Sequence, residues 1–543
     1  MTDSDHNRSQ DQNARPWWND APVRSREWLI LLLTIGLADV TVYHGSGFSG
    51  WAVLFAAIPF LLAGGSPRPR FGLDFLIATT LLLIAAIRLA WLGSVGLVLM
   101  SCGLVVGVGM ALAGIVPFFA QVCQFCLQIL PAGLLGLLQY RPRFGKPNSS
   151  VSQSAILGVA MPIGIVCVFG TIFVMANPDL ANLIGEKVAR FVEWFGDSFT
   201  DFLPQPLQVL FWIAVAWVTI GIWRPLPVAL TVTEILDDEN ADLSDHAKTQ
   251  THEQSQSQYY SAYRNSLLAV VILFAAYLVF EFKTLWFREF PEGFYYSGYA
   301  HQGAAWLTVA LALSTVVLSV IFRGQVLRDP RCPTLRSWGW LWSAENGLLA
   351  LAVFNRLGIY IQFNGMTRMR VVGLLGICSV IVGFLLVLRK VTKNHSFLWL
   401  VRRQALTVCF FVWFYLVLPV DLLVHTANTR WVLAGHPAPS VQISEHPLDA
   451  SALCAISPLL QCEDPIIRDG VRALYARTAI EWFDYNATAD TMSLPQHWTA
   501  CQGAEQCLYD RLLETKALWE PFTPQSRRGA ALWRFHEYSM QWW

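Results

Sequence analysis

The chain has 543 residues, of which 54% are hydrophobic and only 14% are charged. Soluble domains contain about a quarter charged residues, so this composition excludes an ordinary soluble globular protein. The formal net charge is zero, which excludes bulk electrostatic attraction to nucleic acid, and no nucleic-acid partner is expected.

Repeated apolar runs of about 20 residues predict an all-α integral membrane protein. The first 27 residues are polar and lack the compact apolar core of a signal peptide, so the first span is expected to act as an uncleaved insertion signal. The predicted spans are 28–44, 48–65, 73–87, 91–115, 155–175, 207–223, 265–287, 303–322, 341–361, 371–389 and 404–424.

The stretch 118–138 is long enough to cross the membrane, but it contains three glutamines and Pro131. Lysine and arginine favour the cytoplasmic side of a membrane. If 118–138 lies in the interface, the inner segments carry 21 lysines and arginines and the outer loops carry six. If it crosses and makes twelve helices, the three most basic later loops move outside. We therefore predict about eleven transmembrane helices, a cytoplasmic N-terminus and an extracytoplasmic C-terminus.

This topology divides the chain into five parts. They are a cytoplasmic polar N-terminal tail (1–27), an N-terminal transmembrane bundle of about four helices (28–116), a cytoplasmic connector with an interfacial helix (117–154), a second transmembrane bundle of about seven helices (155–424) and a small extracytoplasmic α-helical domain (425–543). Inside the second bundle, 233–258 is acidic and then rich in glutamine and serine, a composition typical of a disordered cytoplasmic loop.

The cysteines follow the same division. Seven of the eleven are scattered through the first 424 residues, where cysteine behaves as a small apolar residue. An even number in the outer segment fits two disulfides in an oxidising compartment, formed by Cys454, Cys462, Cys501 and Cys507. Three connectivities are open, of which we expect the local pairs 454–462 and 501–507. Cys123 and Cys126 form a single CxxC without a partner pair, so neither a metal site nor a cofactor is expected.

Charged residues inside the predicted spans raise the question of function, because each one is costly in a bilayer. With this topology, ionisable residues from five helices converge on one depth in the outer leaflet. This charged layer comprises Asp39, Arg88, Glu281, Lys283, Arg356, Tyr360 and Asp421. In one interpretation, which we favour, the charges form an ion-pair network that fixes helix register. In the other, they line a cavity that binds an anionic headgroup, a lipid-linked sugar or an ion.

The predicted outer loops contain further candidates. Arg368 and Arg370 stand outside against the general charge trend, where they hold headgroup phosphates, contact the C-terminal domain or are simply solvated. His301 lies at the outer surface before the eighth span, and a lone interfacial histidine is usually structural. The chain has no GxxxxGK[ST], GxSxG, HExxH or paired CxxC motif, so nucleotide hydrolysis and serine or zinc hydrolase chemistry lack support.

A series of short sequences resembles a known family. "FVMANPDLANLIGE", "YLVFEFKTLWF", "YAHQGAAWL", "NRLGIYIQFNGMTRMRV", "LPVDLLVHTANTRW" and the terminal "ALWRFHEYSMQWW" occur in this order. The series resembles an uncharacterised bacterial family of polytopic membrane proteins, a domain of unknown function of the 4153/4173 type. The resemblance covers about 155 to 440 and, more loosely, the last twenty residues. It implies a multi-pass inner-membrane protein and supplies no substrate.

The resemblance also marks individual positions. Those that match the family pattern are Arg356, Tyr360, Thr367, Arg370, Asp421, Asn428 and Arg430. The chain departs from the pattern at His301 and Gln302, where the family has Arg and Glu, at Val420, and at His536. Candidate outer-loop contacts are therefore His301, Thr367, Arg368, Arg370, Asn428 and Arg430.

The sequence thus predicts an uncharacterised multi-pass protein of the bacterial inner membrane. Its expected role is non-enzymatic, as a scaffold, sensor or accessory factor in an envelope process. The alternative is a membrane-embedded transporter or transferase acting on a lipid-linked or anionic substrate at the outer leaflet. The expected partners are the lipid bilayer, a phospholipid or lipid-linked ligand, and an envelope protein that binds through 425–543.

Overall fold

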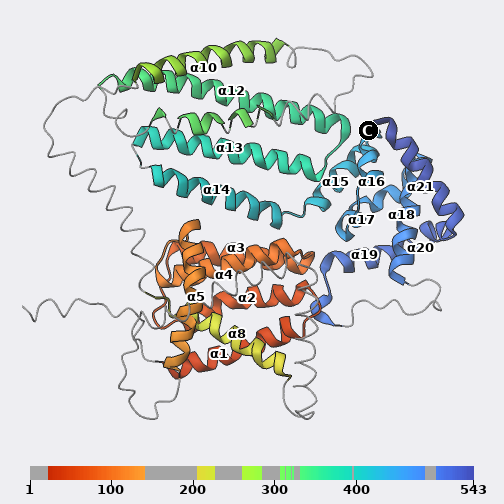
Figure 1. Ribbon diagram of the computed structural model, residues 1–543. Coiled ribbons are helices and arrows are strands. Elements are labelled where there is room, and N and C mark those ends of the chain that lie inside the picture. The colour runs from red at the N-terminus through yellow and green to blue at the C-terminus, as the bar shows by residue number, and fades with distance from the viewer. Residues whose placement is uncertain are drawn as a thin grey trace, which may run out of the picture. The chain divides into compact units, whose positions relative to one another are not determined.

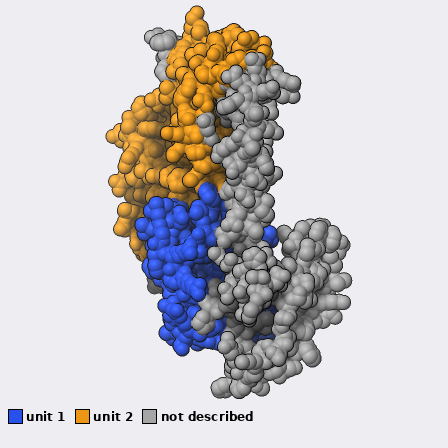
Figure 2. All heavy atoms as spheres, turned by 90° about the vertical axis from the view of Figure 1, so that its left-hand side faces the viewer, with its two compact units in different colours: residues 1–86, 101–234 blue, residues 87–100, 235–543 orange. Residues whose placement is uncertain are grey.

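The computed structural model describes residues 23–140, 205–226, 260–283, 306–322 except 308, 312 and 319–320, 330–483 except 394 and 396, and 497–542. Every regular element in these residues is a helix and none is a strand, which confirms the all-α prediction (Figure 1). The predicted span 155–175, the loop 233–258 and His301 lie outside the described residues. The chain divides into two compact units, 1–86 with 101–234 and 87–100 with 235–543 (Figure 2).

Unit 1 holds the N-terminal helices. They are α1 (Ser25–Ala38), the π-helix η1 (Asp39–Tyr43), α2 (Phe48–Gly65), most of α3 (Leu73–Trp91) and α4 (Val95–Ala113), α5 (Phe119–Gln139) and α8 (Pro206–Trp223). Helix α1 packs against α2 and α8, and the π-helix continues α1 without a break. Buried Phe55 and Leu62 of α2 contribute to the core of this unit.

Helix α5, the element with the doubtful placement, meets the last turns of α8. A Cβ on Gly133 would lie 2.1 Å from the Trp217 ring, and one on Gly221 would lie 2.4 Å from the backbone of Ile129. These glycines allow a close approach that a larger residue would prevent. The Trp217 indole also donates to the carbonyl oxygen of Leu130 at 2.7 Å. In Figure 1, α5 runs across the direction of α2.

Unit 2 contains a row of long helices. They are α10 (Tyr260–Glu281), α12 (Cys332–Asn364), α13 (Arg368–Lys393) and α14 (Phe397–Val417), which run side by side in Figure 1. Leu278, Val353 and Ile377 come from three of these helices and share one buried cluster, to which Leu311 also belongs. Large apolar side chains such as Leu351 remain exposed on the row, a surface that is favourable in lipid and unfavourable in water.

Among the described residues, seven helices are long and apolar enough to cross a membrane, by length and composition: α2, α3, α4, α8, α10, α13 and the 398–417 part of α14. Each corresponds to one of the predicted spans. The predicted span 28–44 is helical as α1 and η1, and 341–361 lies within α12. Helix α12 is not among the seven, because polar residues such as Glu345, Asn346 and Arg356 interrupt its apolar sequence. Residues 306–322 are described only in part.

The predicted span 404–424 is wrong at its outer end. Helix α14 ends at Val417, and a separate helix α15 (Val420–Leu433) begins after Pro419. Proline lacks a backbone N–H and disfavours helical geometry in the residue before it, so the helix stops there. Asp421 therefore lies in the first turn of α15 and not inside a span, and the predicted domain boundary at 424/425 falls within α15.

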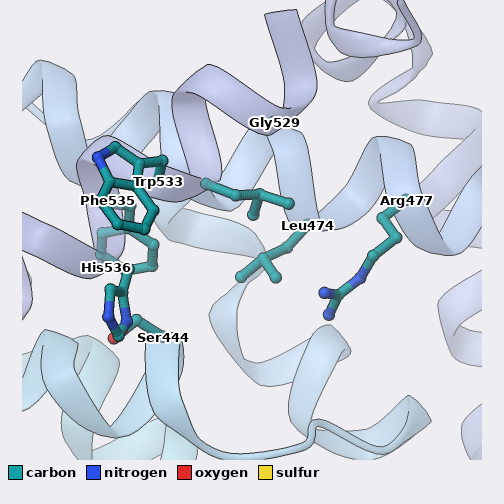
Figure 3. Close-up of a pocket in the computed structure, with 8 residues that line it drawn as sticks. Ser444, Leu474, Arg477, Gly529, Trp533, Phe535 and His536 are labelled. Atoms are coloured by element: carbon teal, nitrogen blue, oxygen red, sulfur yellow. The ribbon is translucent and has the colours of Figure 1, made fainter. Parts of the chain in front are cut away.

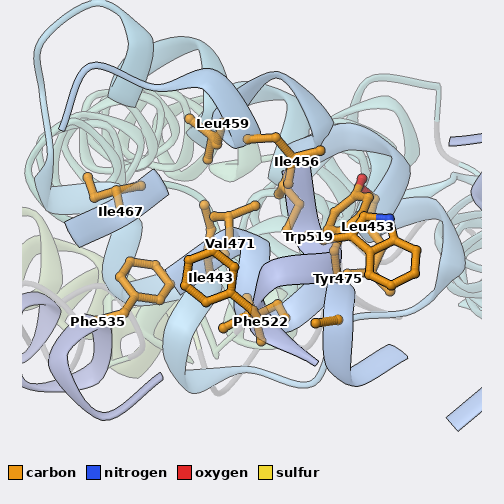
Figure 4. Packing of buried hydrophobic residues seen from close by; sticks show 14 of the residues in the cluster. Ile443, Leu453, Ile456, Leu459, Ile467, Val471, Tyr475, Trp519, Phe522 and Phe535 are labelled. Carbon is orange, nitrogen blue, oxygen red and sulfur yellow. The ribbon is translucent and has the colours of Figure 1, made fainter. Parts of the chain in front are cut away.

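The C-terminal helices pack around one hydrophobic core. After α15 these are the 3-10 helix η5 (Ala438–Ser440), α16 (Val441–Glu445), α17 (Ala450–Ile456), η6 (Ser457–Gln461), α18 (Pro465–Phe483), η7 (Trp498–Ala500), α19 (Gly503–Glu514), α20 (Lys516–Trp519), η8 (Glu520–Phe522), α21 (Gln525–Ser539) and η9 (Met540–Trp542). Val471, Tyr475, Trp519 and Phe535 lie at its centre (Figure 4). The buried Tyr475 hydroxyl donates to the carbonyl oxygen of Leu453 at 2.6 Å. We call residues 420–542 the C-terminal helical cluster.

Candidate functional site

The turn between α12 and α13, residues 364–367, is held by a side chain that is distant in sequence. Gly365 adopts φ +80°, and a Cβ there would lie 2.7 Å from Asn428 Oδ1, so only glycine fits. Asn428 of α15 accepts from the Met366 N–H at 2.7 Å and donates to the Met366 carbonyl oxygen at 2.9 Å. Asn428 is fully buried, so these two bonds satisfy groups that water does not reach.

The same turn is braced from the side of α13. The buried Arg370 guanidinium donates to the carbonyl oxygen of Gly365 and lies over the Tyr360 ring, with Cζ 3.8 Å from the ring centroid. Thr367 Oγ1 accepts from the Arg370 backbone N–H at 3.2 Å, which satisfies a free donor at the start of α13. Three residues that match the family pattern, Tyr360, Thr367 and Arg370, are therefore brought together.

The end of the chain reaches this turn as well. The Asn364 side-chain amide donates to the carbonyl oxygen of Trp542 at 2.7 Å. Gln442 of α16 donates in turn to the carbonyl oxygen of Asn364 at 2.9 Å. The turn is thus bound by the C-terminal helical cluster through α15, α16 and η9.

Beside the turn, an arginine meets two carboxylates. Arg368 binds Asp421 in a bidentate arrangement, with Nη2 2.8 Å from Oδ2 and Nε donating to Oδ1. The carboxyl of Asp421 also lies within electrostatic range of that of Asp449. Asp449 caps α17, because its Oδ1 accepts from the Ala452 N–H and the Ser451 hydroxyl, both at 2.7 Å. We call Asp421 and Asp449 the acidic pair.

The pKa values of the two carboxyls in the acidic pair are shifted in opposite directions. Burial raises the pKa of Asp421, and the neighbouring Asp449 raises it further, against the lowering effect of Arg368. Burial also works to raise the pKa of Asp449, but the interaction with Asp421 and the hydrogen bonds from the Ala452 backbone and Ser451 bring it below its ordinary value. Asp449 therefore ionises at a lower pH than Asp421, as expected when two carboxyls occupy one site.

Two histidines lie close to this pair. Burial lowers the pKa of His425 to about 4, and the Arg368 charge lowers it too, while Asp449 opposes the shift. His425 Nδ1 is buried without a hydrogen-bond partner among the described residues. Burial and Arg368 also lower the pKa of His446. Both imidazoles are therefore neutral at pH 7 and leave Arg368 as the adjacent positive charge.

Within the predicted charged layer, the structure joins one pair. Arg356 of α12 donates through Nε and Nη2 to the Glu281 carboxylate of α10, and both side chains are buried. The Tyr277 hydroxyl donates to Glu281 Oε2 at 2.9 Å and lies 3.5 Å from Arg356 Nη2. Lys283 is exposed two residues after α10 ends.

The other predicted residues lie elsewhere. Asp39 belongs to unit 1, where its Oδ1 accepts from Gln208 Nε2 and Trp212 Nε1, both at 2.8 Å. Arg88 donates to the carbonyl oxygen of Leu92 and lies within electrostatic range of the acidic pair. Arg430 is exposed on α15. Within unit 2, the charged layer is therefore divided between the Arg356–Glu281 pair and the surroundings of Asp421.

Sequence reasoning missed a second buried triad, in unit 1. Arg224 Nη2 and the Tyr140 hydroxyl each contact Glu27 Oε2 at 2.8 Å, and both charged side chains are buried. Glu27 directly precedes one predicted span and Arg224 directly follows another. This position at the helix ends is the sequence signal that could have indicated the pair. Asp449 was missed as well, although an aspartate directly before the helical stretch starting at Ala450 is a typical N-cap.

Cys454 lies near Cys507 and not near Cys462, its expected partner. All four thiols are free, and the Cys454 thiol donates to the carbonyl oxygen of Ala504 at 3.9 Å and lies within electrostatic range of Cys507. Burial raises the pKa of the Cys454 thiol. Cys462 is buried in the hydrophobic core, while Cys501 is exposed. The structure therefore favours 454–507 over the local pair 454–462 as the contact between thiols.

Metal binding has no candidate within the part of the chain that the structure describes, where no three His, Cys, Asp or Glu side chains are grouped to hold an ion. Cys123 and Cys126 are exposed on α5.

The comparison with protein families gives a direct match. The family model of the domain of unknown function DUF4153 matches residues 24–458. The chain belongs to this family. The match covers all the helices apt to cross a membrane and continues through α17, so it includes the α12–α13 turn and the acidic pair. No curated protein and no solved structure matches the chain.

Proposed function

We propose that this DUF4153 membrane protein is a non-enzymatic scaffold, sensor or accessory factor in a process of the bacterial envelope. The observation that carries the proposal is the α12–α13 turn, which the C-terminal helical cluster binds through Asn428, Gln442 and the carbonyl oxygen of Trp542. A rigid connection of this kind transmits a force or a binding event between membrane helices and an attached domain.

The buried charges support the same proposal. Arg356, Glu281 and Tyr277 satisfy one another, as do Arg224, Glu27 and Tyr140. An arginine that already has its carboxylate partner is a poor receptor for a second anion. These triads therefore favour the interpretation in which intramembrane charges fix helix register.

In the proposed topology the protein crosses the inner membrane about eleven times, with a cytoplasmic N-terminus and an extracytoplasmic domain at 425–543. The crossing of α5 at the last turns of α8 supports an interfacial helix in the connector. The Arg224–Glu27 pair then lies at the cytoplasmic ends of the helices, and the acidic pair lies at the outer ends.

The alternative, a transporter or transferase for a lipid-linked or anionic substrate, draws support from one feature. The acidic pair places two carboxyls with opposite pKa shifts beside Arg368, and that combination suits acid–base chemistry on an anion. Its site would be the acidic pair and not the Arg356–Glu281 pair.

Native mass spectrometry of the full chain, extracted with its surrounding lipids, separates the two functions. The scaffold proposal expects a co-purifying protein that is lost when 420–543 is removed and weakened by Asn428→Ala in the complete chain. Asp449→Asn should leave that partner bound. A specific lipid or lipid-linked sugar that is lost with Asp449→Asn, without any protein partner, would reject the scaffold proposal and support the alternative.

A further inference from the structure

A cavity of about 340 Å³ opens on the C-terminal helical cluster between α16, α18 and α21 (Figure 3). Its floor is apolar, since Leu474 and Phe535 belong to the hydrophobic core and Leu532 packs against it. The volume lies at the lower end of the range for ligand pockets, about 300–1,000 Å³, and suits one or two amino-acid side chains.

One side of the cavity carries an unmatched positive charge. Arg477 of α18 is exposed, and no described residue gives it a hydrogen bond or an ion pair. In Figure 3 its side chain extends past Leu474, with the guanidinium on the side of Leu474 away from Trp533 and His536. The indole of Trp533 lines the same cavity and is 65% exposed, an unusual fraction for the largest apolar side chain.

The polar groups of the opposite wall contact one another. His536 Nδ1 is paired with the Glu445 carboxylate, and the Ser444 hydroxyl donates to Glu445 Oε1 at 3.2 Å. Ser444 Oγ also lies 2.6 Å from Ser539 Oγ. Glu445 does not itself line the cavity, so Arg477 is the formally charged side chain among the lining residues and sets a preference for an anion.

We propose that this cavity binds the C-terminal peptide of a partner protein, with the terminal carboxylate on Arg477 and an apolar last side chain against Leu474 and Phe535. Charge complementarity selects the carboxylate, and the apolar floor beside exposed Trp533 selects the side chain. Free inorganic anions would use Arg477 alone and leave the apolar floor uncovered. The inference rests on the proposed scaffold function, for which it names the class of partner.

The test uses the full chain in lipid nanodiscs and two probes, a six-residue peptide that ends in leucine with a free carboxylate, and its C-terminal amide. We expect the free acid to bind at least about tenfold more tightly than the amide, because a hydrogen bond to a charged group is worth about 1.5–3 kcal/mol. Arg477→Gln should abolish this difference, and Trp533→Ala should weaken both peptides equally. Isothermal titration calorimetry measures each dissociation constant.

Matched controls are available on the same cluster. Arg534 is exposed on α21 and donates only weakly to its own helix at Ala530, 3.3 Å away, so Arg534→Gln should leave both constants unchanged. Trp498 is 47% exposed and does not line the cavity, so Trp498→Ala should also leave both dissociation constants unchanged. Equal binding of acid and amide, binding of neither, or an equal effect of Arg534→Gln would overturn the proposal. A protein partner that still co-purifies with Arg477→Gln would overturn the cavity and leave the scaffold function standing.

Discussion

Two arginine–carboxylate groups in unit 2 show how charge balance changes the behaviour of similar contacts. Arg356 and Glu281 are one base and one acid, both buried, with Tyr277 completing the hydrogen bonds. Arg368 faces two acids, Asp421 and Asp449, with neutral His425 nearby. The first group is a matched pair of opposite charges, whereas the second contains two carboxyls whose pKa values are shifted in opposite directions and a histidine whose pKa is lowered.

A balanced group, with one arginine and one carboxylate, holds its helices in a fixed arrangement. An unbalanced group, with one arginine and two carboxyls, changes its charge with its surroundings. Removing one partner from a balanced buried pair strands the other charge. In the unbalanced group, a change of pH alters the charge without any mutation. The following predictions test this contrast, beginning with the largest expected effect.

Arg356→Met should destabilise the protein by about 3–5 kcal/mol, because Glu281 would remain buried without its cation. Thermal unfolding in detergent, followed by helical circular dichroism, measures the loss. Adding Glu281→Gln should recover part of it, and Lys283→Met should have little effect, because Lys283 is exposed. A variant with unchanged stability but lost cellular function would show that Arg356 serves a site.

Acidification should destabilise the folded protein through His425. Its pKa falls from 6.5 to about 4 on folding, so the stabilising contribution is fully present above pH 6.5 and is lost as the pH falls toward 4. The total loss is about 3 kcal/mol, since one pKa unit corresponds to about 1.4 kcal/mol. The groups that set this shift together with burial are Asp449, Arg368 and His446.

Unfolding measured between pH 7 and pH 4 tests this prediction. Asp421 acts in the opposite direction, since its raised pKa gives stability at low pH that is lost as the pH rises. His425→Gln should therefore remove most of the downward slope, and His436→Gln, at an exposed position, should keep it. An identical slope in both variants would assign the pH dependence to other groups.

Asn428→Ala should cost about 2 kcal/mol, because it leaves the buried N–H and carbonyl groups of Met366 without partners. Hydrogen exchange should show faster exchange in 364–370 and no change in α10. Arg430→Ala, on the exposed side of the same helix, is the matched control. Unchanged protection of the turn would contradict its dependence on Asn428.

Arg368→Gln should have the smallest effect on stability, about 1 kcal/mol or less, because the Arg368 side chain is 47% exposed and its pair is screened by solvent. The same change should alter the pH dependence of the unfolding free energy more than it alters the unfolding free energy at pH 7, since it removes the cation beside the acidic pair. If Arg368→Gln cost as much stability as Arg356→Met, the difference in solvent exposure between the two arginines would not determine how much each contributes to stability.

Much of the secondary structure follows from local sequence. Apolar runs located all seven helices that are long and apolar enough to cross a membrane, and α2 (Phe48–Gly65) agrees with its prediction at both ends. The family resemblance marked Tyr360, Thr367, Arg370 and Asn428, which meet at one turn. The break at Pro419 was missed, because the apolar sequence continues across it and hydropathy averages over a single helix-breaking residue.

The sequence by itself determined the all-helical class and the positions of the long apolar helices, because hydrophobicity and helical rise act on consecutive residues. Only the tertiary structure decided which charges meet. Depth along a helix says nothing of the angle at which a side chain leaves it, so Asp39, Glu281 and Asp421 were equal candidates for Arg356. Because α10 packs against α12, Arg356 pairs with Glu281. Asp421 instead pairs with Arg368, which follows the α12–α13 turn.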